Sequence, residues 1–147
     1  MAIQLRKLSR DNLFKCIGLD TNEDQKEFVA TNVVSIAQAY VEPTWVPLAI
    51  YADDTMVGFV MYGRDAETGF DWIIRLMIDT RYQGHGYGRA AMLELLPMLK
   101  QSPDSNGIKI SCEPKNRTAE RLYAQLGFRP TGDIEEGEVV ALLQMES

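Results

Sequence analysis

A short segment of the chain, residues 83–89, combines three glycines with an arginine: Gly84, Gly86, Gly88 and Arg89. A helical pattern begins near Gly86, and the first turn of a helix carries unpaired backbone N–H groups and a dipole that favours anions. Glycine lacks the Cβ atom that would keep a phosphate away from these groups, and it permits positive φ angles. We therefore predict a phosphate-binding loop, to which Arg89 adds positive charge. The predicted contact residues are Gln83, Gly84, His85, Gly86, Tyr87, Gly88 and Arg89.

Two well-known phosphate motifs fit this segment poorly. A P-loop needs a lysine directly after its last glycine, whereas Arg89 stands there. A dinucleotide fingerprint needs its third glycine one position later, at the start of a βαβ unit, but antiparallel strands are predicted to precede this loop. A tight turn between a strand and a helix that binds no ligand remains an alternative at this stage.

The two cysteines, Cys16 and Cys112, are far apart in the sequence, and the single histidine, His85, lies between them. This spacing matches neither a zinc motif nor a disulfide framework. We therefore expect two buried or unreactive thiols in a cytoplasmic protein, and no metal site.

The composition limits the class of protein. The 147 residues include 46% hydrophobic and 24% charged residues, which suits one folded domain. No apolar run approaches the roughly 20 residues that span a bilayer, and the N-terminus lacks the apolar centre of a secretory signal. The formal net charge of −6 argues against a nucleic-acid partner and suits a cationic ligand, although solubility alone also explains it.

The elements that must position these residues form an α/β pattern. Apolar or alternating runs predict strands at residues 3–8, 48–52, 56–62, 70–79, 108–113 and 139–145, with a further strand near residue 133. Helical spacing predicts helices that end near residue 19 and that cover residues 24–40, 86–100 and 117–126. The order β-α-α-β-β-β-α-β-α-β-β indicates a mixed sheet that is largely antiparallel at first.

Particular residues mark the ends of these elements. Ser9 or Asp11 is expected to cap the first helix. Asn116 is expected to cap the last helix, and Gly127 to end it. The prolines at positions 43 and 47 are expected to interrupt any regular element before residue 48.

Two motifs in this order resemble the GNAT superfamily of N-acetyltransferases. Gln83, Gly86 and Gly88 match its Q/R-x-x-G-x-G/A signature. The later N-x-x-A-x-x-x-Y-x-x-x-G-F element is matched at Asn116, Ala119, Tyr123, Gly127 and Phe128. The resemblance covers nearly the whole chain and implies one acetyltransferase domain over residues 1–147. It also implies an α/β (α+β) fold with a mixed, largely antiparallel sheet of about six to seven strands, flanked by about four helices.

The N-terminal half is also similar to bacterial spermine/spermidine (diamine) N-acetyltransferases, in the segments EDQKEFVA, EPTWVPLAIY and DDTMVGFVMYG. This narrower similarity implies a polyamine as the acetyl acceptor. An aminoglycoside or a protein N-terminus is an alternative acceptor, and a catalytically silent acyl-CoA-binding module is an alternative outside the enzymes. Members of the superfamily are often dimers, so a homodimer is a further expectation.

The resemblance implies acetyl-CoA as the co-substrate. Its diphosphate would bind the backbone N–H groups of residues 84–89, and its pantetheine arm would pair with the backbone of Leu76, Met77 and Ile78 like an added strand. The amide of Ile78 would polarise the thioester carbonyl. Asn116 would cap its helix and also form a hydrogen bond to the cofactor.

The implied reaction is a direct attack of an amine on the thioester. Tyr123 matches the family's tyrosine and would protonate the leaving thiolate, since a tyrosine is protonated at pH 7; by spacing alone it is a half-buried helix residue. His85 has a suitable pKa for a base, but its ring is expected to point from the phosphate loop to solvent. Ile73 and Ile74 occupy positions at which some relatives carry glutamate, so the base stays unassigned.

Acidic residues are the candidates for binding the amine. Glu23 and Asp24 lie at the break between the first two predicted helices, where the family lines its acceptor site. Glu42 precedes the next part of the sheet, and Glu135 and Glu136 lie between the last two predicted strands. Each could bind an ammonium group or relay a proton, and each taken singly is also consistent with a solvated surface acid.

Overall fold

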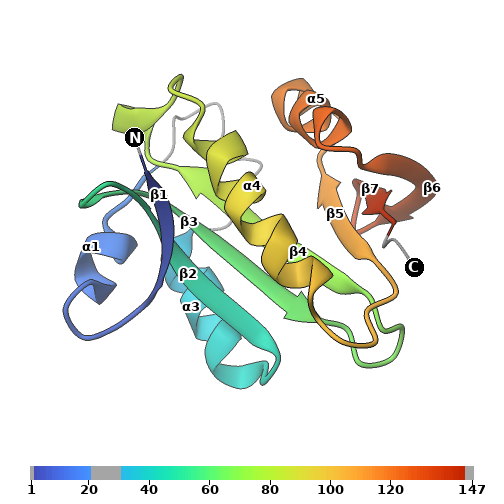
Figure 1. Cartoon of the computed structure of the whole chain (residues 1–147), viewed down its shortest axis with the longest axis horizontal. Helices are drawn as coiled ribbons and strands as arrows, with labels where there is room; N and C mark the ends of the chain where they lie inside the picture. The colour runs from blue at the N-terminus through green and yellow to red at the C-terminus, as the bar shows by residue number, and fades with distance from the viewer. Residues whose placement is uncertain (1, 21–30, 145–147) are drawn as a thin grey trace.

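The computed structural model of the chain describes residues 2–20 and 31–144, which build a seven-stranded sheet with the strand order β1-β2-β3-β4-β5-β7-β6 (Figure 1). The strands are β1 (Ile3–Lys7), β2 (Trp45–Ala52), β3 (Thr55–Arg64), β4 (Asp71–Ile78), β5 (Ile108–Cys112), β6 (Arg129–Glu135) and β7 (Glu138–Leu143). The described α-helices are α1 (Leu13–Ile17), α3 (Asn32–Val41), α4 (Tyr87–Lys100) and α5 (Arg117–Gln125), and a short 3-10 helix covers Thr80–Tyr82. Among the strands that the structure describes, only β4 and β5 pair in parallel, so the predicted GNAT-like, largely antiparallel sheet is confirmed.

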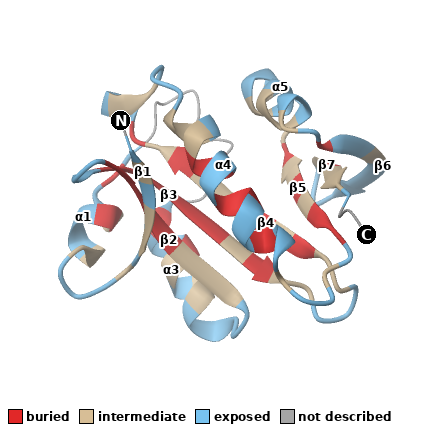
Figure 2. Ribbon diagram, viewed as in Figure 1, coloured by how far each residue is buried: buried red, intermediate tan, exposed pale blue. Residues whose placement is uncertain are grey.

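Apolar side chains cover both faces of this sheet. Along β2, Leu48 and Ile50 belong to one cluster and Ala49 and Tyr51 to the other, because successive strand residues point to opposite faces. Helix α4 packs on the first face with Ala91, Met92, Leu95, Leu96 and Leu99. Helices α1 and α3 cover the other face (Figure 1), and the buried positions follow the central strands and the inner side of α4 (Figure 2). The sheet is therefore a firm support for the loops at its edges.

Strand β2 begins earlier than predicted. It starts at Trp45 and includes Pro47, which is the register partner of Met61 in β3, so the expectation that Pro47 interrupts regular structure was wrong. The described pairing of β2 with β1 begins only at Leu48, opposite Lys7. Pro47 therefore lies where the strand has an open side, a position at which a missing N–H is tolerated in a sheet.

The first two helices begin differently from the prediction. The N-cap of α1 is Asn12, not Ser9 or Asp11, and the Asn12 side chain accepts a hydrogen bond from the backbone N–H of Ser9 at 2.8 Å. This hydrogen bond closes a turn over residues 9–12, so Ser9 and Asp11 lie in the turn before the helix and do not cap it. The helix expected over residues 24–40 does not run through Thr31, which caps α3 by accepting from the N–H of Val34 at 3.3 Å. Residues 24–30 lie outside the described residues.

Other local predictions are confirmed. Helix α4 begins directly after Gly86, and α5 begins after Asn116. Gly127 follows α5 with φ +102°, the left-handed conformation typical of a helix end. Cys16 and Cys112 are both buried free thiols. In the part of the chain that the structure describes, no helix has the length and apolar character needed to cross a membrane.

Candidate active site

A central cleft opens where β4 and β5 separate. The register between these strands covers three positions and ends with Ile73 opposite Ile110. Farther along β4, residues 76–78 still pair with β3 on one side, while they line a cleft of about 1720 Å³. The edge of β4 that faces this cleft is therefore available to pair with an extended ligand.

The glycine loop forms one wall of the cleft. Gly84 has φ +83° and Gly86 has φ +77°, and a Cβ built on either residue would meet no atom of the described residues within 4 Å, apart from its neighbours in the chain. Gly86 is the N-cap of α4, so the backbone at the helix entrance is open to a ligand, as the phosphate-binding prediction requires. Gly88 has a different environment, because a Cβ there would stand 3.7 Å from Ile78 Cγ1.

Side chains fasten this loop to the end of β4. Gln83 donates from Nε2 to the carbonyl oxygen of Ile78 at 2.9 Å. The buried carboxylate of Asp79 accepts from the backbone N–H and the guanidinium of Arg81 and from the backbone N–H of Asp20, each at 2.9 Å. Burial by itself would raise the pKa of Asp79, but these hydrogen bonds and the charge of Arg81 outweigh it and hold the pKa below its usual value. The loop is therefore preorganised by the protein itself.

Six of the seven predicted contact residues line the cleft: Gln83, Gly84, Gly86, Tyr87, Gly88 and Arg89. His85 is exposed and lies outside that lining, and its ring packs against Tyr87 with 5.5 Å between the ring centroids. His85 is therefore the one residue of the predicted loop set whose side chain is not part of the cleft lining.

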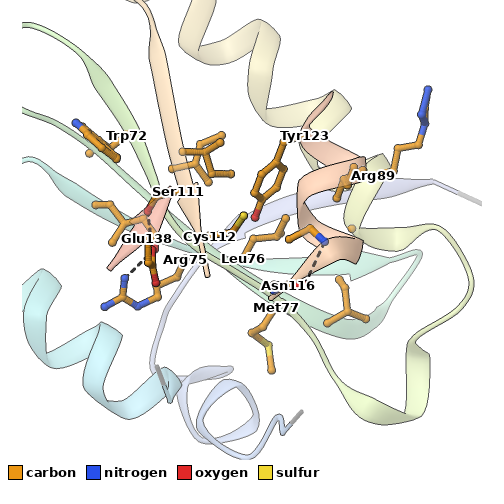
Figure 3. A pocket seen from close by; sticks show the side chains of 18 of the residues that line it. Trp72, Arg75, Leu76, Met77, Arg89, Ser111, Cys112, Asn116, Tyr123 and Glu138 are labelled. Atoms are coloured by element: carbon orange, nitrogen blue, oxygen red, sulfur yellow. Dashed lines mark hydrogen bonds between the residues drawn. The ribbon is translucent and has the colours of Figure 1, made fainter. Parts of the chain in front are cut away.

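Tyr123 reaches the middle of the cleft from α5. In the view of Figure 3 its hydroxyl points toward Cys112, with Asn116 and Arg89 on one side and Glu138 on the other. Burial raises the pKa of Tyr123 well above its usual value, and the charges of Cys112 and Glu138 raise it further. The phenol is therefore protonated across the neutral pH range and can donate a proton or a hydrogen bond.

Asn116 has the structural role that was predicted. Its Oδ1 accepts a hydrogen bond from the backbone N–H of Ala119 at 3.2 Å and so caps α5. The side chain also lines the cleft, where its amide nitrogen can still donate to a ligand. The cap holds α5, and with it Tyr123, at a defined position beside β4.

Three of the five predicted acidic residues, Glu42, Glu135 and Glu136, line the cleft. All three are exposed. The other two, Glu23 and Asp24, lie outside the described residues. The structure therefore places in the cleft the predicted acid at the end of α3 and two predicted acids of the β6–β7 hairpin.

The turn between β6 and β7 brings further acids to the same cleft. Glu136 with φ +51° and Gly137 with φ +81° form this turn, as expected for two central residues of a tight hairpin. Glu136 lines the cleft, and Glu135 and Glu138 are register partners across the hairpin. Like charges directly opposite one another weaken a sheet, so this pair does not serve the stability of the hairpin.

Glu138 was missed by sequence reasoning. Its Oε1 accepts a hydrogen bond from the hydroxyl of Ser111 at 2.6 Å, and both residues line the cleft (Figure 3). Strand alternation places Glu138 on the same face of β7 as the buried Val140. An acidic residue in phase with a buried position is unusual, and that pattern was a usable signal.

Arg75 is a second residue that sequence reasoning did not select. Its Nη1 donates to the carbonyl oxygen of Ile74 at 2.8 Å and its Nη2 to Oε1 of Gln38 at 3.3 Å, while its buried Nε has no acceptor among the described residues. Burial lowers the pKa of Arg75, and the charges of Glu138 and Glu136 act in the opposite direction. A cation thus stands among the acids of the cleft.

The cleft combines three chemical features along its length. An open helix entrance with Arg89 suits an anionic diphosphate. An exposed strand edge suits an extended amide-containing arm, and the phenol of Tyr123 suits a leaving group that needs a proton. Among the described residues, no three histidine, cysteine, aspartate or glutamate side chains stand together as a metal site would need. These features define an acyltransferase that uses a coenzyme A thioester.

The comparison with known families agrees with this class. The model of the Acetyltransferase (GNAT) family matches residues 8–128, which is more than half of the chain, and the protein belongs to that family. It is an acetyl-CoA-dependent acetyltransferase of the GNAT family. The GNAT resemblance seen in the two sequence motifs is therefore confirmed.

Individual relatives show how far the similarity extends. The spermine/spermidine N(1)-acetyltransferase of Bacillus subtilis (strain 168) is 28% identical over 152 aligned residues, which cover 99% of this chain and all of that protein. The PaiA N-acetyltransferase of Thermoplasma acidophilum, solved with coenzyme A, matches with a TM-score of 0.71 at 18% identity, over 98% of this chain and 99% of that chain. The aminoglycoside acetyltransferase AAC(6')-Ib, also solved with coenzyme A, matches with a TM-score of 0.80 at 16% identity, over 97% and 95%. The two solved structures share the fold.

Proposed function

We propose that this enzyme transfers the acetyl group of acetyl-CoA to a primary amine of a polyamine, such as spermidine or spermine. The observation that carries the proposal is the set of acids that line the cleft: Glu42, Glu135, Glu136 and Glu138. Three of them come from one hairpin, where their mutual repulsion is relieved when a polycation binds between them. The Bacillus subtilis relative named as a spermine/spermidine N(1)-acetyltransferase supports the same acceptor.

The glycine loop and β4 bind the co-substrate in this proposal. The backbone N–H groups of residues 84–89 hold the diphosphate, and Leu76, Met77 and Ile78 pair with the pantetheine arm through their backbone. The backbone N–H of Asp79 bonds to Val57 on β3, so strand alternation directs the N–H of Ile78 to the cleft edge, where it polarises the thioester carbonyl. Acetyl-CoA supplies an activated thioester when it is bound.

Tyr123 acts as the general acid. Its raised pKa keeps the proton on the phenol until a thiolate leaves, and its hydroxyl points into the cleft between the loop and the acids (Figure 3). The amine attacks in its neutral form, because an ammonium group with a pKa of about 10 has no lone pair. The acids favour binding of the charged polyamine chain, while the reacting nitrogen loses its proton.

A peptide N-terminus is the second candidate acceptor. It is favoured by the guanidinium of Arg75, which lines the cleft and has N–H donors beyond those that bind Ile74 and Gln38, so that a peptide carbonyl finds a donor there. The polyamine and the peptide differ in the hydrogen-bonding groups that they bring next to the Arg75 guanidinium. A polyamine carries only donors and positive charge, whereas a peptide carries carbonyl acceptors.

Release of the free thiol of coenzyme A across a panel of amines tests the proposal. Spermidine and spermine are expected to give the highest kcat/KM, and monoamines such as butylamine lower values, because one ammonium group meets fewer of the acids. Faster turnover of peptides than of polyamines would favour the second candidate. Binding of coenzyme A without thiol release from acetyl-CoA in the presence of any amine would contradict both.

A further inference from the structure

Glu138 differs from the other glutamates that line the cleft. Glu42, Glu135 and Glu136 are exposed, whereas Glu138 is half-buried at the start of β7. One of its oxygens is held by the hydroxyl of Ser111 at 2.6 Å. A carboxylate has about four acceptor positions on its two oxygens, so Glu138 keeps the capacity to accept from a second donor in the cleft.

Glu138 also stands near the groups at the centre of the cleft. It lines the same cleft as Tyr123, Cys112 and Arg75, and its charge raises the pKa of Tyr123 and of Cys112 and opposes the lowering of the pKa of Arg75 by burial. Figure 3 shows Glu138 and Tyr123 on opposite sides of Cys112. An amine that reacts beside the hydroxyl of Tyr123 therefore lies in the same part of the cleft as the Glu138 carboxylate.

We infer that Glu138 accepts the proton that the attacking amine loses, and that Ser111 positions it for this role. The inference rests on the proposed direct transfer to an amine, and not on which amine is the natural acceptor. The neutral nitrogen forms a bond to the thioester carbon, and the C–S bond breaks. One N–H proton passes to a Glu138 oxygen, directly or through one water, while Tyr123 gives its proton to the sulfur. Proton exchange with water then restores both side chains.

Other candidate bases are placed less well. His85 is exposed and outside the cleft lining. Ile73 and Ile74 fill the β4 positions at which some relatives carry glutamate, and neither can take a proton. Glu136 sits at the tip of the hairpin turn and is exposed, without the partner that fixes Glu138. Two strands of the sheet, β5 and β7, therefore support one carboxylate at this place.

The variant Glu138→Gln tests the inference. It keeps the side-chain shape and an oxygen that can accept from Ser111, but it has no carboxylate to take a proton. With acetyl-CoA and amine saturating, kcat is expected to fall by about 100-fold or more, in the range of lost general-base catalysis. The affinity for coenzyme A, measured by calorimetry, is expected to change by less than about 2-fold, which also shows that the variant is folded.

Glu67→Gln is the matched control. It causes the same change in net charge on an exposed loop between β3 and β4, outside the lining of the cleft, and is expected to keep the wild-type kcat. In Glu138→Ala, added formate is expected to restore kcat in proportion to its concentration. Adding Ser111→Ala to Glu138→Gln is expected to cause no further loss, because Ser111 acts through Glu138.

The acceptor in these assays is the amine that the wild-type enzyme uses fastest. Failure of polyamines would then overturn the proposed acceptor and leave the Glu138 test intact. A raised KM for the amine with unchanged kcat in Glu138→Gln would assign Glu138 to binding alone and overturn the inference. Equal losses in Glu138→Gln and Glu67→Gln, or no response of Glu138→Ala to formate, would overturn it as well.

Discussion

The substitution Gly86→Ala tests whether the glycine loop holds the diphosphate of coenzyme A. Gly86 has φ +77°, and an alanine in the left-handed conformation costs about 1–2 kcal/mol. For a chain of 147 residues, this loss corresponds to a decrease in Tm of roughly 2–8 °C. The added Cβ meets no protein atom within 4 Å, so the rest of the fold has no reason to change.

The effect on ligand affinity is separate from the effect on stability. In the bound enzyme the new methyl group occupies space that we assign to the diphosphate. Losing one hydrogen bond to a charged group costs about 1.5–3 kcal/mol, which weakens binding by roughly 10- to 150-fold. Gly132→Ala is the matched control, because Gly132 also has a positive φ, +89°, and an open Cβ position, but it lies outside the cleft.

Calorimetric titration with coenzyme A and thermal melting separate these two effects. Both variants are expected to lose similar stability, and only Gly86→Ala is expected to lose affinity. If Gly86→Ala and Gly132→Ala bind coenzyme A equally well, the open space beside Gly86 does not hold the diphosphate, and the physical basis of the site assignment is wrong.

Three further predictions address other parts of the site. Tyr123→Phe keeps the ring against Phe128 and is expected to lower kcat by about 100-fold while the affinity for coenzyme A stays within about 2-fold; an unchanged kcat would remove Tyr123 as the acid. Arg89→Gln is expected to weaken coenzyme A binding by a few-fold at low salt and by less at high salt, since Arg89 is exposed; a loss that is independent of salt would contradict a charge effect. Asp79 has a lowered pKa in the folded state, so its stabilising contribution is present above its unfolded pKa near pH 4 and is lost as the pH falls through the folded value. Urea unfolding should therefore show Asp79→Asn less stable than the wild type at pH 7, with the difference shrinking toward pH 2, and a difference that is constant with pH would refute this role.

The glycine loop was predictable because its geometry is local. The positive φ angles of Gly84 and Gly86 and the start of α4 depend on neighbouring residues in the sequence. The cap that Asn116 forms on α5 is equally local, because its partner Ala119 is three residues away. Local rules also have limits, as Ser9 shows: three polar residues could cap α1, and only the turn made by Asn12 decides among them. Pro47 shows the same limit, because its place in β2 depends on where β1 ends.

The acidic wall of the cleft was only partly predictable. Glu135 and Glu136 could be selected as acids in a turn. Glu138 is positioned by a hydrogen bond from Ser111, which is 27 residues away in the sequence. Arg75 likewise meets Gln38 across 37 residues. Contacts of this kind depend on the order and register of the strands, which cannot be predicted from a single sequence.

The sequence by itself therefore determined the family, the glycine loop at the start of α4 and the position of Tyr123 in α5, because short motifs with fixed spacing encode backbone geometry. The tertiary structure alone decided that β4 and β5 separate after Ile73 and that Glu138 and Arg75 line the cleft. The physical reason is that a site built from separate strands exists only once the sheet has set their register. The backbone geometry of the glycine loop is local, whereas the cleft that brings the acids together is a property of the assembled sheet.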